Sequence, residues 1–209
     1  MTVVAEQFGG PSGALGHVIT RLLARGNGSF NRWLVRELAT VTPAPTTVIE
    51  IGSGPGVALH ELSSTYPEAR IVGVDPSDVV QKSARRRNAA AIATGRLTLV
   101  LGDLGSAAMH QPADLVLAVH VIYFWPDPAK ELRRIHDALV PGGRVALGYQ
   151  LRTNMPKPAQ RNFPKSGFRL YDSDDQIDAL LREAGFAAQE VRIFGTPERP
   201  GGRLSIAIA

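Results

Sequence analysis

The chain has 209 residues, of which 44% are hydrophobic and 20% are charged. This balance is typical of one globular domain with a full core. The absence of cysteine excludes disulfides, thiolate metal sites and cysteine nucleophiles, and it fits a reducing compartment. The net charge of +4 permits nucleic acid or an anionic substrate as a partner without requiring either.

Targeting signals are not expected at the N-terminus. Residues 1–10 lack the basic start and apolar core of a signal peptide. The longest apolar run, 115–125, is much shorter than the roughly 20 residues of a membrane span. We therefore expect a cytoplasmic protein without a membrane span.

Two helical patterns precede the first strand. Apolar residues follow helical spacing in 15–23 and 30–40, and a Gly/Asn/Ser break separates the two patterns. The proline-rich segment 42–45 then leads into the first strand. We expect residues 1–45 to form a helical cap on the sheet, with Gln7-Phe8-Gly9 as a lid over the ligand site.

A strand, a glycine turn and a helix form the centre of the chain. The buried strand 48–51 runs into Gly52-Ser53-Gly54-Pro55-Gly56, and a helix with Leu59 and Leu62 on one side follows. Such a turn presents backbone N–H groups and the positive end of a helix dipole to a ligand. Glu50 lies at the end of the strand, where an unpaired buried charge is costly and needs donors.

Strands and helices alternate through the rest of the chain. This alternation predicts an α/β fold with a doubly wound, mostly parallel sheet that binds ligands beyond the carboxyl ends of its strands. Ser77 and the capping box Ser173–Gln176 mark helix starts, and a C-terminal hairpin should close the sheet at one edge. The expected strands are 70–77, 96–103, 114–120, 144–149, 188–194 and 203–209, and the expected helices are 78–87, 128–139 and 174–184.

We expect residues 151–171 to form a substrate loop. The segment 153–171 has three prolines and no clear period, so we expect it to be irregular. An anionic small-molecule acceptor explains its basic residues as well as nucleic acid does; they are Arg152, Lys157, Arg161, Lys165 and Arg169.

The glycine spacing carries a family resemblance. Glu50 precedes G-x-G-x-G, whereas a dinucleotide fingerprint reads G-x-G-x-x-G. Acid-x-G-x-G-x-G resembles the first motif of the class I, seven-strand, Rossmann-like S-adenosylmethionine methyltransferases, and Pro141-Gly142-Gly143-Arg144 and Ala184-Gly185-Phe186 also match. The resemblance is closest to the small-molecule branch. It implies one domain over 1–209, with a core of 46–209, and S-adenosyl-L-methionine as cofactor.

Residues after the first three strands are the expected cofactor ligands. Asp75 can accept both ribose hydroxyls or can instead cap the next helix. The resemblance implies that Glu50 binds the methionine ammonium, whereas Asp103 accepts from the adenine amino group unless it is only a turn residue. The further expected cofactor-binding residues are Gly52, Ser53, Gly54, Gly56, Pro76, Gly102, Leu104 and His120.

His120 is the candidate catalytic residue. It follows the fourth strand and can act as a general base for a hydroxyl or amine, or can contact the cofactor through its backbone only. Tyr123, Phe124 and Trp125 form either an aromatic wall near the sulfonium or part of the core. The acids and histidines show no metal-ligand spacing, so no metal is expected.

We therefore predict a methyltransferase that moves a methyl group from S-adenosylmethionine to an O, N or C nucleophile of a small molecule. An NAD-dependent oxidoreductase is disfavoured by the glycine spacing and Glu50. A nucleic-acid methyltransferase is disfavoured because no Asn/Asp-Pro-Pro-aromatic segment follows the fourth strand. A non-catalytic binding protein that keeps the fold is the third alternative.

Overall fold

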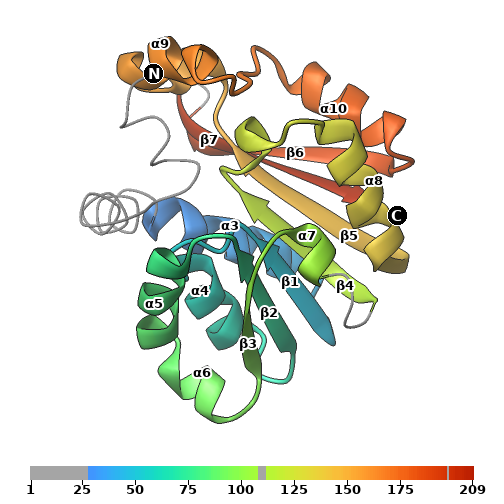
Figure 1. Ribbon diagram of the computed structural model, residues 1–209. Coiled ribbons are helices and arrows are strands. Elements are labelled where there is room, and N and C mark those ends of the chain that lie inside the picture. Colours follow the sequence, from blue (N-terminus) through green and yellow to red (C-terminus); the bar gives the residue numbers. More distant parts are fainter. Residues whose placement is uncertain (1–27, 108–111, 197) are drawn as a thin grey trace.

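The computed structural model describes residues 28–107, 112–196 and 198–209 (Figure 1). The expected helix 15–23 and the lid at 7–9 lie outside these residues. The described strands are β1 (Thr47–Ile51), β2 (Arg70–Asp75), β3 (Leu97–Leu101), β4 (Ala113–Val119), β5 (Leu139–Tyr149), β6 (Ala187–Thr196) and β7 (Arg199–Ile208). The described helices are α3 (Gly28–Val41), α4 (Val57–Thr65), α5 (Asp78–Arg87), α6 (Ala89–Ala93), α7 (Leu104–Ala107), α8 (Pro128–Ala138), α9 (Lys157–Lys165) and α10 (Asp174–Glu183), with 3-10 turns η1 (Ile122–Phe124) and η2 (Arg152–Asn154).

The strands form one seven-stranded sheet in the order β3-β2-β1-β4-β5-β7-β6. The pairs among β1 to β5 are parallel, whereas β7 runs antiparallel to both β5 and β6. The strand order reverses at β1, which brings the ends of β1 and β4 together at a switch point. The expected doubly wound sheet with a C-terminal edge hairpin is confirmed.

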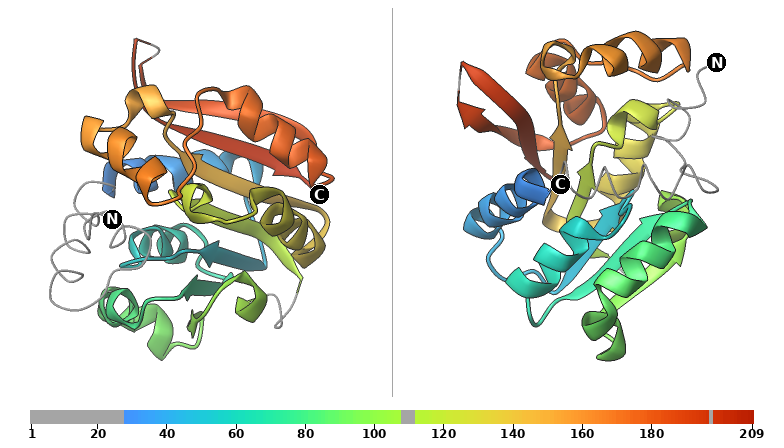
Figure 2. Two further views of the ribbon diagram at one scale, coloured as in Figure 1. Left: turned by 45° about the horizontal axis from the view of Figure 1, so that its top comes forward. Right: turned by 90° about the vertical axis from the view of Figure 1, so that its left-hand side faces the viewer.

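The strands bury both faces, as their continuous apolar runs indicate. Val48, Leu115 and Leu117 point to the face covered by α3 and α4. Their chain neighbours Ile49 and Val116 point to the opposite face, which α8 and α10 cover (Figure 2). Glu50 shares the face of Val48, because side chains alternate along a strand. Its carboxylate therefore lies on the side of the sheet covered by α3 and α4.

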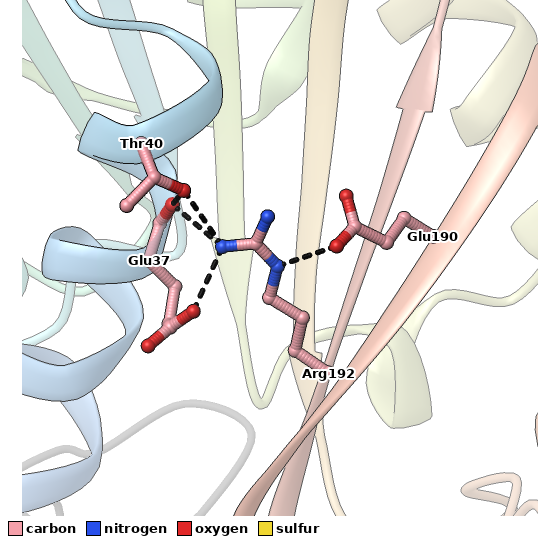
Figure 3. A network of polar contacts seen from close by, with 4 residues as sticks. All are labelled: Glu37, Thr40, Glu190 and Arg192. Atoms are coloured by element: carbon pink, nitrogen blue, oxygen red, sulfur yellow. Dashed lines mark hydrogen bonds and ion pairs between the residues drawn. The ribbon is translucent and has the colours of Figure 1, made fainter.

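Helix α3 is the described part of the expected N-terminal cap. It buries Phe30, Leu34 and Leu38 against the sheet. Arg192 of the edge strand β6 also forms hydrogen bonds with α3. Its Nη1 donates to Glu37 O at 3.1 Å, and to Glu37 Oε2 and Thr40 Oγ1 at 2.8 Å each (Figure 3). Its Nε donates to Glu190 Oε1 at 2.7 Å. Since exposed ion pairs contribute about 1 kcal/mol or less, apolar burial supplies most of the stabilisation of α3.

The prediction that 153–171 is irregular is wrong. The segment contains η2 and the helix α9, which lies at the opposite end of the molecule from α6 (Figures 1 and 2). Pro156 occupies the N-cap position and Pro158 the first turn, where the missing N–H of proline costs nothing. Pro164 lies one residue before the end of the helix. Prolines that indicated a loop thus lie at the N-cap, in the first turn and in the last turn of a short helix.

Smaller differences concern element ends. β5 begins at Leu139, so the expected turn at 141–143 belongs to an irregular start of that strand. Ser173 is the N-cap of α10 but makes no capping hydrogen bond through its side chain; instead Gln176 Oε1 accepts from Asp172 N at 2.6 Å. The short helices α6 and α7 were not predicted. Among the described helices, none is long and apolar enough to cross a membrane.

Candidate functional site

A pocket of about 720 Å³ lies at the carboxyl ends of the parallel strands. It is the place at which doubly wound sheets bind ligands. Most residues expected to bind a cofactor line it: Glu50, Gly52, Ser53, Gly54, Asp75, Pro76, Gly102, Asp103 and His120. Gly56 instead packs against α5, and Leu104 begins α7 with a side chain outside the described part of the structure.

The three glycines of the turn serve two purposes. Gly52 has a φ of 66°, and a Cβ at this position would overlap Val121 Cγ1. A Cβ on Gly56 would lie 2.5 Å from Asn88 Nδ2 and 2.9 Å from Ala84 Cα. Of the three, only Gly54 has open space beside its Cα, since a Cβ at this position would lie 3.9 Å from the nearest atom. Packing within the protein therefore requires two of the glycines, and Gly54 is the one that leaves room for a ligand.

Glu50 is buried at the end of β1 with 3% of its surface exposed. Its Oε2 has no hydrogen-bond partner among the described residues. Burial raises the pKa of Glu50 well above its usual value; the nearby charge of Asp75 adds to this, and a hydrogen bond from the Leu59 backbone opposes it. Ser53 Oγ and Asn31 Oδ1 are likewise buried without a described partner, and both residues line the pocket. Three polar side chains thus leave hydrogen-bonding capacity in one pocket.

Asp75 locks the glycine turn to the end of β2. Its Oδ2 accepts from Gly54 N at 2.8 Å, and its Oδ1 accepts from Ser77 N at 2.9 Å. Burial raises the pKa of this carboxyl, and the two backbone hydrogen bonds oppose the shift. A carboxylate has about four lone-pair sites. The capping contact at α5 is therefore compatible with further acceptance from a ligand.

His120 has an unusual backbone conformation. Its φ of 58° is the only positive value at a non-glycine position among the described residues. His120 N donates to Gly148 O at 2.7 Å, and the ring centroid lies 5.2 Å from that of Phe30. Strain of this kind clusters at functional sites. Burial lowers the pKa of His120 to about 4, so its imidazole is neutral at pH 7.

This pKa can be measured directly by NMR titration of the histidine ring protons. We expect one histidine signal to stay in the neutral form down to about pH 5. This signal should be absent in His120→Asn, a substitution chosen because asparagine tolerates the positive φ at this position. A folded pKa below the unfolded value of about 6.5 gives stability that is lost as pH falls from about 6.5 towards 4. The variant should lose this acid dependence. A His120 signal that titrates near pH 6.5 would contradict the lowered pKa of this ring.

The comparisons with known proteins identify the family. A family model described as a methyltransferase domain matches residues 23–191. The chain belongs to this methyltransferase-domain family. Its sheet order, its glycine turn after Glu50 and its pocket at the strand ends therefore belong to a methyltransferase domain.

Relatives differ in how much of this methyltransferase domain they share. A trans-aconitate 2-methyltransferase of Methylobacterium radiotolerans is 32% identical over 118 residues, which are 56% of this chain and 42% of that protein. The chain thus spans less than half the length of that relative. An uncharacterized methyltransferase of Bacillus subtilis, YdaC, is 27% identical over 80% of this chain and 93% of its own length.

Solved structures share the methyltransferase fold. An O-methyltransferase family protein of Burkholderia thailandensis has a TM-score of 0.71 at 16% identity, over 91% of this chain and 58% of that chain. N-methyltransferase NodS of Bradyrhizobium japonicum, solved with S-adenosyl-L-homocysteine, has a TM-score of 0.64 at 15% identity, over 86% of this chain and 85% of that chain. At these identities, the likeness shows the fold alone.

Aromatic side chains form the other half of the pocket of this methyltransferase domain. Tyr123, Phe124 and Trp125 all line it, and the Phe124 ring centroid lies 5.6 Å from that of Phe163 on α9. Tyr123 also belongs to the hydrophobic core, so this residue both lines the pocket and packs in the core. Its hydroxyl accepts from Gln150 N and donates to Gln150 O at 3.1 Å. Tyr123 therefore fixes the end of β5 beside the pocket.

Several pocket residues were not predicted from the sequence. Asn31 lies on the buried face of α3, next to Phe30 and Leu34. A polar residue on this apolar face is the sequence feature that could have indicated a binding role. Others come from the segment 151–171, whose structure the sequence did not indicate: Met155, Pro156, Pro158, Ala159, Asn162 and Phe163. The described residues contain no group of three or more His, Asp or Glu side chains that could hold a metal.

Proposed function

We propose that the chain is an S-adenosylmethionine-dependent methyltransferase that acts on an O, N or C nucleophile of a small molecule. The observation that carries this proposal is the unpartnered Glu50 Oε2, which is buried beside the glycine turn in the pocket. A buried carboxylate without a donor is costly. A ligand ammonium, such as that of the methionine part of the cofactor, supplies the missing partner. Membership of the methyltransferase-domain family supports the same ligand.

Each end of the cofactor has candidate partners in the pocket. In this proposal Glu50, with Ser53 and Asn31, holds the amino-acid end, since all three have polar atoms without a described partner. Asp75 accepts from the ribose hydroxyls. Pro76, Gly102 and Asp103 lie on the adenine side, and the open space at Gly54 leaves room for the ligand to approach. These groups fit the cofactor in both charge and hydrogen-bonding type.

When bound, S-adenosylmethionine supplies a methyl group that is already activated by its sulfonium. The chain's own residues then align the acceptor and exclude water, and alignment alone can be worth roughly 7–11 kcal/mol. The aromatic side chains on the acceptor side exclude water. A neutral His120 can take a proton from an acceptor hydroxyl or amine, although a pKa of about 4 makes it a weak base.

The domain assignment belongs to the same proposal. Residues 1–209 form one domain, with a cap of 1–45, a core of 46–209 and an acceptor-binding segment of 151–171. The position of Met155 and Phe163 in the pocket lining supports a role of 151–171 at the acceptor. The cytoplasmic location stays a prediction.

Calorimetric titration tests the function. We expect binding heat with S-adenosylmethionine and with S-adenosylhomocysteine, and none with NAD. Binding of NAD alone would favour the oxidoreductase alternative, and tight cofactor binding without any product over a broad acceptor panel would favour a non-catalytic protein. Salt-sensitive RNA binding would favour the nucleic-acid alternative.

A further inference from the structure

The acceptor half of the pocket is built for a ligand without negative charge. On the basis of the proposed function, we propose that the acceptor is an uncharged, largely apolar and planar molecule. The trans-aconitate relative acts, by its name, on a carboxylated substrate, and the basic residues of 151–171 are compatible with an anionic acceptor on sequence grounds. The side chains that line the pocket indicate a different substrate class.

The lining of this half is aromatic and apolar. Its aromatic members come from two segments that contact each other: the ring centroid of Phe163 lies 6.2 Å from that of Tyr123 and 5.6 Å from that of Phe124. Aromatic rings favour a flat apolar partner through stacking or edge contacts. The further residues on this side are Trp125, Pro126, Glu131, Gln150, Met155, Pro156, Pro158, Ala159 and Asn162. Neither lysine nor arginine occurs in the described lining.

Helix α9 separates apolar from basic residues. Ala159, Asn162 and Phe163 lie at helical spacing on one face and line the pocket. Lys157, Arg161 and Lys165 follow one another at intervals of four residues, share the opposite face and are exposed. The basic face of α9 thus points away from the pocket and is the solvent-exposed side of an amphipathic helix.

The other two basic residues of the segment, Arg152 and Arg169, already have partners within the protein. Arg152 Nε lies 2.9 Å from Asp172 Oδ1, and Arg169 Nη2 donates to Pro126 O at 3.1 Å. Both charges are therefore used in fixing the segment. The expectation that these side chains hold an anionic acceptor is not supported by their positions.

Electrostatics favour the same ligand class. The charged side chains among the described lining residues are all acidic: Glu50, Asp75, Asp103 and Glu131. His120 is neutral, because burial lowers its pKa to about 4. An acceptor carboxylate in this pocket would lose its hydration and find no cationic side chain among the described lining residues, which is a large penalty. A flat uncharged molecule meets no such penalty and gains the aromatic contacts.

A matched pair of probes tests the proposal: 2-naphthol and 6-hydroxy-2-naphthoate share the ring and the hydroxyl and differ by one carboxylate. Each is titrated by calorimetry into the protein saturated with S-adenosylhomocysteine, with trans-aconitate as a third probe. We expect 2-naphthol to bind at least about tenfold more tightly than either carboxylated probe. Equal or tighter binding of a carboxylated probe, or no binding of 2-naphthol, overturns the proposal.

Two variants on α9 distinguish its faces. Asn162→Arg places a cation on the pocket face and should shift the affinity ratio at least about tenfold towards 6-hydroxy-2-naphthoate. Arg161→Ala, on the exposed face, should leave the ratio unchanged, and thermal unfolding checks that both variants fold. If Arg161→Ala weakened the carboxylated probe selectively, the acceptor class would be wrong. Failure of S-adenosylhomocysteine to bind would instead refute the proposed function, and the same probe pair titrated into the free protein would still test the pocket.

Discussion

A Glu50→Gln variant will bind S-adenosylhomocysteine about 10- to 100-fold more weakly than the parent, without loss of folding stability. The affinity falls because a hydrogen bond to a charged partner, worth about 1.5–3 kcal/mol, is removed. The folding stability does not fall, because burying the Glu50 carboxylate, whose Oε2 has no described partner, is itself costly to the folded state. Calorimetry gives the affinity, and urea unfolding gives the stability.

The same substitution has a defined pH signature. The folded pKa of Glu50 is raised above the unfolded value of about 4.3, so the folded state binds more protons. Its contribution to stability is therefore complete below about pH 4 and is lost as pH rises through the folded pKa. The stability of the parent relative to Glu50→Gln should fall with rising pH in this window. Glu68→Gln, at an exposed position, is the matched control and should show neither effect. Wild-type affinity in Glu50→Gln would remove Glu50 from the cofactor site.

An Asp75→Ala variant will lose at least about 100-fold in affinity for S-adenosylhomocysteine, because the proposed contacts to two ribose hydroxyls are lost together. It will also be less stable, since Gly54 N and Ser77 N lose their acceptor. The glycine turn depends on the first of these hydrogen bonds. Calorimetry and urea unfolding again separate the two effects.

Asp114→Ala is the matched control for this prediction. Asp114 Oδ2 accepts from Thr46 N and Thr47 N at 2.8 Å each, so its loss also leaves two backbone N–H groups without an acceptor. Asp114 lies at the start of β4 and is not among the pocket residues. Both variants should be destabilised, and only Asp75→Ala should lose cofactor affinity. An equal loss of affinity in both would mean that Asp75 acts only through the fold.

The sheet and the polar half of the pocket were predictable from the sequence for a physical reason. Strand periodicity and glycine turns are local signals, and the parallel sheet brings the ends of consecutive strands together at one edge. Glu50, Asp75 and Asp103 lie at or just after the ends of three different strands but line one pocket. Their convergence follows from topology alone.

The acceptor half was not predictable in the same way. Prolines at Pro156 and Pro158 indicated a loop but begin a helix, and the sequence alone did not reveal which face of that helix meets the pocket. The direction of Arg161 and Asn162 depends on how α9 packs, which is a tertiary property. Asn31 reaches the pocket for a similar reason, because its direction depends on how α3 packs against α4 and β7. The packing roles of Gly52 and Gly56 likewise depend on partners distant in sequence.

The most direct test is a crystal structure of the protein with S-adenosylhomocysteine. The account predicts the nucleoside across the ends of β1, β2 and β3, with its ammonium at Glu50 and its ribose hydroxyls at Asp75. A nucleoside bound elsewhere, or this pocket filled by the protein's own side chains, would contradict it.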